Sequence, residues 1–309
     1  MKGEDALRRR SRASVAHTAG GLVLRPRYRL QRVCAAVASV ILGVVLLVWS
    51  LTPVYHMLLI ALDPEDGEIE FEGIIWPPDP TLKSFHAVLT QGYWLVENFW
   101  QQFGNSFFIG LMTMGLTVLI GSLASFAFGR MRLSRGWLLA NVPLLTYIVP
   151  ASFLVIPFIR IMASYGLTNT LWAIIAADVT FATPYAILIL QQYAKLVPLE
   201  LDEAAQVDGA SPVQVYLHIY LPLIAPALVA VGIFALLLAW NEYLYQYLLL
   251  SSTRNTTVAI AIAQFFNSDE APWNYMMATA IIYALPPIVI FYALGRYMAA
   301  GLTMGAVRG

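Results

Sequence analysis

The sequence predicts an all-α polytopic membrane protein with six transmembrane helices and with both ends of the chain in the cytoplasm. Three observations support this fold class. The 309 residues are 59% hydrophobic and only 12% charged, whereas a typical soluble domain is about one quarter charged. The apolar residues gather in runs of the length that a bilayer requires, about 20 residues each. The basic residues are distributed very unequally between the intervening loops, which predicts the orientation.

Six apolar runs are the predicted transmembrane helices. Five of them contain no Asp, Glu, Lys or Arg, and the fourth in chain order contains only Asp178. Prolines inside several runs are compatible with membrane helices, because neighbouring helices can satisfy the backbone groups that a proline frees. The six runs are residues 33–62, 98–129, 136–159, 171–192, 219–241 and 271–295.

The orientation follows from the basic residues. With the N-terminus inside, fifteen Lys and Arg residues are cytoplasmic and only Lys83, Arg160 and Arg254 lie outside, as the excess of basic residues in cytoplasmic loops requires. The predicted segments are a cytoplasmic Arg-rich tail (1–32), a first transmembrane helix (33–62), an external loop (63–97), a five-helix core (98–300) and a cytoplasmic tail (301–309).

The longest cytoplasmic connection, residues 195–222, is predicted to form two short helices around a hinge. Pro198 suits the first position of a helix, and the acidic residues that follow complement the helix dipole. Gly209 can end this helix in the left-handed conformation. Ser211 and Gln214 then form a capping-box pattern that starts the second helix. Such a loop is shaped either for docking another protein or for packing on its own bundle, and the physical pattern alone favours neither.

Motifs for catalysis and for metal binding are missing from the sequence. It has no Gly-rich phosphate loop, no HExxH and no CxxC pair, and its four histidines are scattered. We therefore predict no catalytic residue, no metal ligand and no cofactor bound by this chain.

The connection carries a specific motif. Glu203-Ala204-Ala205, Gly209, Ile219 and Leu221-Pro222 reproduce the spacing EAA-x3-G-x9-I-x-LP, and the segment resembles the EAA loop of ABC-importer permeases. The segments "PPDPTLKSF", "AWNEYLY" and "GLTMGAVRG" are similar to the carbohydrate branch of that family, the second permease of maltose- and glycerol-phosphate-type systems. The resemblance covers nearly the whole chain from residue 33.

The resemblance implies a type I importer permease in the bacterial plasma (inner) membrane. It implies an ATP-driven, binding-protein-dependent importer of a sugar or sugar derivative, in which this chain forms half of the translocation path. The implied partners are a second homologous permease, two cytoplasmic ATPase subunits, an external sugar-binding protein and membrane lipid, without nucleic acid. The chain itself is then not an enzyme, because ATP and Mg²⁺ are used by the ATPase subunits.

The resemblance also implies which residues dock the ATPase. The EAA loop, residues 195–222, would seat in a cleft of one ATPase subunit, and a small-residue surface would permit close approach. The implied docking residues are Glu203, Ala204, Ala205, Asp208, Gly209, Leu221 and Pro222.

Polar residues in the predicted spans are candidates for the translocation path. Asp178 is costly at membrane depth, by about 2.5–3.5 kcal/mol, so it either lines the path, pairs with a neighbouring polar group or lies near the outer surface. Asn241, Glu242 and Tyr245 offer hydrogen bonds and an aromatic face to a sugar, and the alternative is a belt of tyrosines at headgroup depth.

Two other classes of protein fit the sequence less well. An ion-coupled secondary transporter of a small polar solute would have inverted repeats and ion-coupling residues at the midplane, and no repeat is visible. A membrane-embedded enzyme would need a catalytic constellation, which the sequence lacks.

Overall fold

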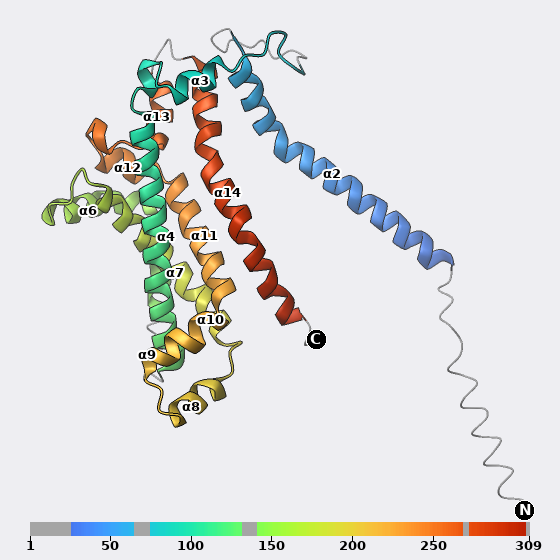
Figure 1. Ribbon diagram of the computed structural model, residues 1–309, viewed down its shortest axis with the longest axis vertical. Helices are drawn as coiled ribbons and strands as arrows, with labels where there is room; N and C mark the ends of the chain where they lie inside the picture. The colour runs from blue at the N-terminus through green and yellow to red at the C-terminus, as the bar shows by residue number, and fades with distance from the viewer. Residues whose placement is uncertain (1–25, 65–74, 132–140, 268–271, 307–309) are drawn as a thin grey trace, which may run out of the picture. The chain divides into compact units, whose positions relative to one another are not determined.

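The computed structural model describes residues 26–64, 75–131, 141–267 and 272–306, and divides into two units, residues 1–56 and 57–309 (Figure 1). Most of helix α2 (Pro26–Leu62) belongs to the first unit. This helix includes the predicted span 33–62 and starts seven residues earlier, inside the predicted tail. The rest of that tail, residues 1–25, lies outside the described residues.

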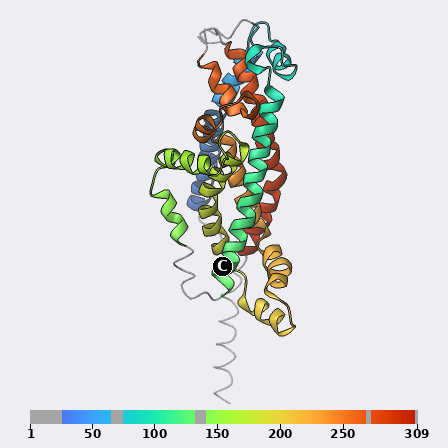
Figure 2. The ribbon, with the colours of Figure 1, turned by 90° about the vertical axis from the view of Figure 1, so that its left-hand side faces the viewer.

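Four helices of the second unit run side by side (Figures 1 and 2): α4 (Phe99–Arg130), α7 (Leu171–Ala194), α11 (Ala225–Asn241) and α14 (Trp273–Ala306). Helix α4 packs against α7 and α11, and α11 packs against α14. Gly121 allows the close approach of α4 to α7, because a Cβ at this position would lie only 2.9 Å from the Cβ of Ala186.

Short elements lie at the two ends of these helices. The elements at one end, which we call the EAA-loop end, are α8 (Leu199–Val207), α9 (Pro212–Val215), the π-helical turn η3 (Tyr216–Tyr220) and α10 (Leu221–Leu223). Those toward the opposite end are α3 (Lys83–Leu89), η1 (Trp94–Val96), α12 (Leu244–Leu249), η4 (Thr253–Asn255) and α13 (Val258–Phe265). Of the described residues none is in a strand, so the predicted all-α class is confirmed.

The predicted third span, 136–159, is not one helix. Its described part consists of the 3-10 turn η2 (Val142–Tyr147) and the start of α6 (Ala151–Ser164). Pro150 separates them with an extended ψ of 135°, and proline lacks the N–H that would continue a helix. A run without charges satisfies the composition of a span and gives no warning of such a break.

The predicted count of six spans is not confirmed. In the described part of the chain, four helices are long and apolar enough to cross a membrane. A fifth is obtained if the segments Pro212–Leu223 and Ala225–Asn241, which meet at an angle of 78°, are counted as one bent span. Helix α14 extends to Ala306, so the predicted C-terminal tail 301–309 is helical in its described part.

Candidate functional site

Helix α8 carries the first part of the EAA motif. Its N-cap is Pro198, with φ −58° and ψ 136°, so the helix starts one residue later than predicted. Glu200 and Asp202 lie in its first turn, where negative charge interacts favourably with the exposed N–H groups. The acidic residues that the sequence predicts to complement the helix dipole are therefore present at the start of this helix.

Gly209 ends α8 as the sequence predicts. Its φ is +83°, in the left-handed region that residues with a Cβ adopt at a cost. The Gly209 N–H donates to the Gln206 carbonyl at 3.0 Å, and the Ala210 N–H donates to the Ala205 carbonyl at 2.9 Å. These two bonds form a complete Schellman motif, which turns the chain sharply toward α9.

The start of α9 confirms the predicted capping box. The Ser211 hydroxyl accepts a hydrogen bond from the Gln214 N–H at 3.4 Å, and the Ser211 N–H donates to the Gln214 side-chain oxygen at 2.7 Å. Pro212 occupies the first helical position, where its missing N–H costs nothing. The hinge between α8 and α9 is thus set by residues within the hinge itself.

The EAA residues form an accessible surface on this hinge. Glu203, Ala204, Asp208, Gly209 and Pro222 are exposed, whereas Ala205 and Leu221 are half-buried. Apolar side chains of the same loop are also exposed, with Val207 at 88% and Val213 at 64%. An accessible surface that combines acidic, small and apolar side chains matches the composition expected of a docking surface.

A buried ion pair holds α8 on the bundle. The Arg130 guanidinium, at the end of α4, lies 3.1 Å from the Asp202 carboxylate, and both side chains are less than one tenth exposed. The contact joins Arg130 Nη1 to Asp202 Oδ2 and is Coulombic without the alignment of a hydrogen bond, since Arg130 Nη1 has no hydrogen-bond partner among the described residues. The adjacent acids Asp202 and Glu203 therefore differ: Asp202 is buried against α4, and Glu203 is exposed.

Arg130 also stabilises the chain that leads into the EAA loop. Its Nη2 donates to the carbonyl oxygens of Ala194 at 3.0 Å and Val197 at 2.9 Å. Arg130 thus contacts the end of α7, the turn that follows α7, and α8. Sequence reasoning counted Arg130 only as a basic loop residue and Asp202 only as a dipole complement, and no local pattern links two residues so distant in the chain.

Two tyrosines attach η3 to the same end of α4. The Tyr216 hydroxyl is 2.8 Å from the Ser122 hydroxyl, and the Tyr220 hydroxyl is 2.9 Å from the Ser125 hydroxyl. The Phe126 ring packs edge-on against both tyrosine rings. The second half of the EAA loop is therefore fixed to α4 by hydroxyl pairs and aromatic packing, with the Arg130 guanidinium 5.9 Å from the centre of the Tyr220 ring.

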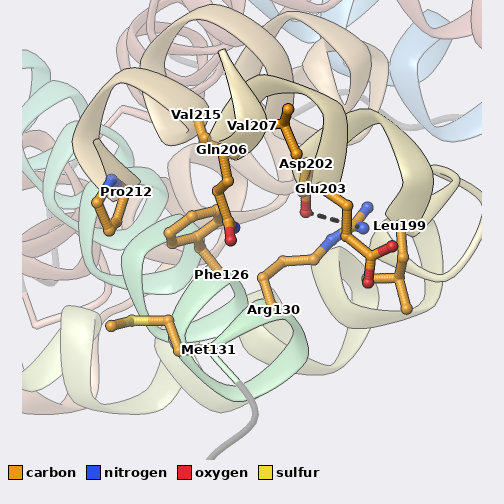
Figure 3. Close-up of a pocket in the computed structure, with 10 residues that line it drawn as sticks. All are labelled: Phe126, Arg130, Met131, Leu199, Asp202, Glu203, Gln206, Val207, Pro212 and Val215. Carbon is orange, nitrogen blue, oxygen red and sulfur yellow. Dashed lines mark ion pairs between the residues drawn. The ribbon is translucent and has the colours of Figure 1, made fainter. Parts of the chain in front are cut away.

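A cavity of about 570 Å³ lies between the end of α4 and the helices α8 and α9. Figure 3 shows Arg130 and Asp202 facing each other in it, with Glu203 beside them. The lining residues are Phe126, Arg130, Met131, Leu199, Asp202, Glu203, Gln206, Val207, Pro212 and Val215. Acidic and apolar groups of α8 thus line an open pocket next to the accessible EAA surface.

Asp178, the first path candidate, lies in the interior of the bundle. Its exposed fraction is 0%, and neither carboxylate oxygen has a hydrogen-bond partner among the described residues. It is buried in α7, which packs against α4 and α11. The structure thus places Asp178 in the interior, without a hydrogen-bonded partner among the described residues. A role in the translocation path stays a prediction.

The other path candidates lie where α11 ends and α12 begins. Asn241 is exposed and donates to the Leu237 carbonyl at 2.7 Å. Glu242 accepts from the N–H groups of Tyr245 at 2.8 Å and Gln246 at 3.0 Å, so it caps α12. Tyr245 is buried, with its hydroxyl donating to the Ala151 carbonyl at 2.7 Å. Glu242 and Tyr245 therefore make contacts that stabilise the fold, and of the three candidates only Asn241 is exposed.

The described residues include no group of three or more His, Cys, Asp or Glu side chains that could hold a metal ion.

The fold and the EAA loop together define the class of protein, an ABC importer permease. Over 87% of its length the chain superposes on a bacterial ABC transporter chain involved in the import of the acidic polysaccharide alginate, covering 98% of that chain with a TM-score of 0.71 and 19% identity. At that identity the likeness concerns the fold. Residues 117–304 match the model of the family of binding-protein-dependent transport system inner membrane components. The chain belongs to this family and is a multi-pass protein of the bacterial inner membrane.

Several curated proteins are similar over most of their length. The inner membrane ABC transporter permease protein YcjP of Escherichia coli (strain K12) is 30% identical over 265 residues, which is 85% of this chain and 93% of YcjP. The trehalose transport system permease protein SugB of Mycobacterium tuberculosis (strain CDC 1551 / Oshkosh) is 36% identical over 207 residues, which is 66% of this chain and 76% of SugB. The diacetylchitobiose uptake system permease protein DasC of Streptomyces coelicolor (strain ATCC BAA-471 / A3(2) / M145) is 29% identical over 270 residues, or 86% of this chain and 95% of DasC.

Proposed function

We propose that this chain is the permease subunit of an ATP-driven importer of a sugar or sugar derivative, and that its EAA loop docks an ATPase subunit. Family membership supports a binding-protein-dependent transporter. The relatives named for trehalose, diacetylchitobiose and arabinooligosaccharides support a sugar as the transported solute.

One observation carries the docking role. Asp202 of α8 is fixed to Arg130 inside the protein, while the neighbouring Glu203 and Ala204 are exposed. A helix that is anchored on one side and accessible on the other can move only together with the end of α4. A force applied to its accessible side by a partner is therefore passed directly to the bundle. This arrangement supports the docking role, because a partner can shift a conformational equilibrium only through contacts that differ between the two states.

The proposed assembly has four further parts. A second, homologous permease would complete the translocation path, and two cytoplasmic ATPase subunits would bind ATP and Mg²⁺. An external sugar-binding protein would deliver the solute, as the similarity to a chain of an alginate transporter solved with its periplasmic protein supports. The docking contacts would come from Glu203, Ala204, Ala205, Asp208, Gly209, Leu221 and Pro222.

The docking role predicts that charge reversal on the EAA surface separates the ATPase from this chain. The tagged chain, solubilised gently from its own cells, should retain a second permease and an ATPase, identified by mass spectrometry. Glu203→Lys combined with Gly209→Asp should lose the ATPase and retain the second permease, because both changed residues are exposed on the EAA loop and aspartate tolerates the left-handed conformation of Gly209 better than most residues. Sugar uptake by the cells should fall to background.

The matched control is Asp79→Lys, which reverses an exposed charge far from the EAA loop and should retain the ATPase. Loss of the ATPase in the control as well would contradict docking through the EAA surface. A chain that purifies without any ATPase in its wild-type form would contradict the importer itself and favour the ion-coupled secondary transporter.

A path role for Asp178 is tested separately. Asp178→Asn preserves the shape of the side chain and removes its charge. If Asp178 acts in the path, uptake should fall at least tenfold while the ATPase is retained. Unchanged uptake would assign Asp178 to the interior alone. Asn241→Ala is the comparison variant. Its side chain is exposed at the end of α11, so truncation there leaves no buried cavity.

A further inference from the structure

A second cavity lies at the end of the bundle opposite the EAA loop. Its volume is about 370 Å³, within the range of small-molecule sites. It forms where η1 and the start of α4 meet α12, η4 and α13. Under the predicted topology this is the external side, the side from which a binding protein would deliver a solute.

The lining combines aromatic rings with hydrogen-bonding groups. Trp94 and Tyr247 supply the rings, and they are 60% and 53% exposed. Asn98, Gln102 and Gln264 supply amide groups. An aromatic ring presents an apolar face and, in Trp and Tyr, a polar edge, and a sugar ring presents the complementary apolar C–H face and hydroxyl edge.

Gln102 is the member of this lining that most needs a ligand. Its exposed fraction is 5%, and its Oε1 has no hydrogen-bond partner among the described residues. A buried carbonyl oxygen without a donor is unfavourable, because it has given up its hydrogen bonds to water, and such an exception in a folded protein calls for an explanation. A sugar hydroxyl in the cavity would supply that donor.

The wall of the cavity is held in place by hydrogen bonds from α4. Asn105, one turn beyond Gln102, donates to the carbonyl oxygens of Arg254 at 2.9 Å and Thr256 at 2.8 Å. The Ser106 hydroxyl accepts from the Val258 N–H at 3.1 Å. The segment containing η4 is therefore fixed to α4 next to the cavity, as a preformed site requires.

The charge in the lining indicates the class of sugar. Glu97 is the only charged residue among those that line the cavity, and its carboxylate accepts from Asn98 Nδ2 at 3.2 Å. A carboxylate at the rim repels anionic solutes and accepts hydrogen bonds from neutral ones. The lining is thus compatible with an uncharged sugar.

We infer that this cavity binds one end of a neutral di- or oligosaccharide, with a sugar ring against Trp94, the more exposed of the two rings, and a hydroxyl bonded to Gln102. The inference rests on the proposed function in that the transported solute is a sugar. It adds an external sugar site on this subunit, separate from Asp178 and from the end of α11.

The test uses the tagged chain, purified with its bound subunits into lipid nanodiscs, and saturation-transfer difference NMR. The probes are three neutral disaccharides, namely trehalose, N,N′-diacetylchitobiose and arabinobiose, and one acidic disaccharide of mannuronate. At least one neutral probe should show saturation transfer, and the acidic probe should show none. Trp94→Ala and Gln102→Leu should each reduce the signal at least fivefold.

The matched control is Trp273→Ala, which removes an exposed tryptophan that does not line the cavity and should leave the signal unchanged. Trp94 is largely exposed, so Trp94→Ala remains decisive even if Gln102→Leu fails to fold. Absence of signal from all three neutral probes, equal binding of the acidic probe, or a signal that survives Trp94→Ala would overturn the inference.

Uptake measurements separate this inference from the proposed function. If deletion of the chain leaves the uptake of every sugar unchanged, the proposed function fails. If uptake requires the chain but the NMR signal and the KM of uptake are unchanged in Trp94→Ala, only the external site fails.

Discussion

At the EAA-loop end a buried ion pair joins α8 to the bundle, in addition to the hydroxyl pairs of η3, whereas at the opposite end neutral amide and hydroxyl groups make the connections. Arg130 and Asp202 are both buried, and Arg130 also bonds to two carbonyl oxygens. At the other end, Asn105 and Asn169 bind backbone groups of the segment after α12, and Thr257 donates to Gln246.

The difference has an energetic consequence. Breaking a buried ion pair leaves an uncompensated charge, at a cost of about 3–5 kcal/mol, whereas a neutral hydrogen bond contributes about 1 kcal/mol. Helix α8 thus depends mainly on one strong contact, η3 has its own hydroxyl pairs with α4, and the opposite end distributes its stability over many neutral bonds. A loop that transmits movement is suited to one strong anchor, and a surface that receives a solute is suited to a rigid network.

Breaking the ion pair between Arg130 and Asp202 should have the largest effect. Arg130→Met leaves the Asp202 carboxylate buried without its cation, and we expect the free energy that holds the EAA loop to fall by about 3–5 kcal/mol. Hydrogen exchange of the α8 amides should rise by at least a hundredfold, and the ATPase should be lost on purification. Exchange in α13, at the opposite end, should be unchanged.

The double variant Arg130→Met/Asp202→Leu sharpens this test. Replacing both members of a buried pair by apolar residues is often neutral, so the double variant should regain most of the protection of α8. Equal exchange in the single and double variants would contradict the buried-charge explanation.

At the opposite end, Asn169→Ala should have an intermediate effect. Asn169 Oδ1 accepts from the N–H groups of Ser251 at 2.9 Å and Ser252 at 3.1 Å, and its φ is +57°. Two lost hydrogen bonds and the cost of this φ for alanine together predict about 2–3 kcal/mol. The thermal midpoint of the purified chain measures the loss.

Asn169→Asp is the matched control, because it retains both acceptor positions and tolerates the left-handed conformation. It should cost less than about 1 kcal/mol. If it is as damaging as Asn169→Ala, the side-chain oxygen is not what holds this end together.

The same two ends show what the sequence could predict. The hinge of the EAA loop was predicted correctly at Gly209, Ser211 and Gln214, because helix caps depend on residues within four positions of one another. The partner of Asp202 was not predicted, because Arg130 lies on another helix and no periodicity connects the two. The ion pair could be found only once the fold placed α4 beside α8.

Outside the EAA loop, the sequence does not reveal where helices break. The run 136–159 has the composition of a single span, and the extended conformation of Pro150 divides it. For Glu242, a path candidate in the sequence, nothing in the sequence reveals that α11 ends at Asn241 and that the Glu242 carboxylate caps the next helix. Hydropathy measures apolar content over a window and contains little information about where a helix stops.

Within the EAA loop, Gly209→Ala tests the turn that ends α8. Alanine at a φ of +83° should cost about 1–2 kcal/mol, and the loss should appear as faster exchange in the last turn of α8. Gly115→Ala is the control, since Gly115 lies inside α4 with open space around its Cα and alanine there should stabilise the helix by about 0.5–1 kcal/mol. Effects of the same sign at both positions would contradict the conformational argument.

The smallest expected effect is that of the cap on α9. Ser211→Ala removes the acceptor of the Gln214 N–H and half of the capping box, which should cost about 1 kcal/mol. Ser211→Asp retains an acceptor and should be close to neutral. Because η3 beyond α9 is held separately by Tyr216 and Tyr220, exchange should rise in α9 and stay unchanged in η3. If η3 loosens together with α9, the loop responds as a single unit, and the neutral contacts of the tyrosines do not act independently of the cap.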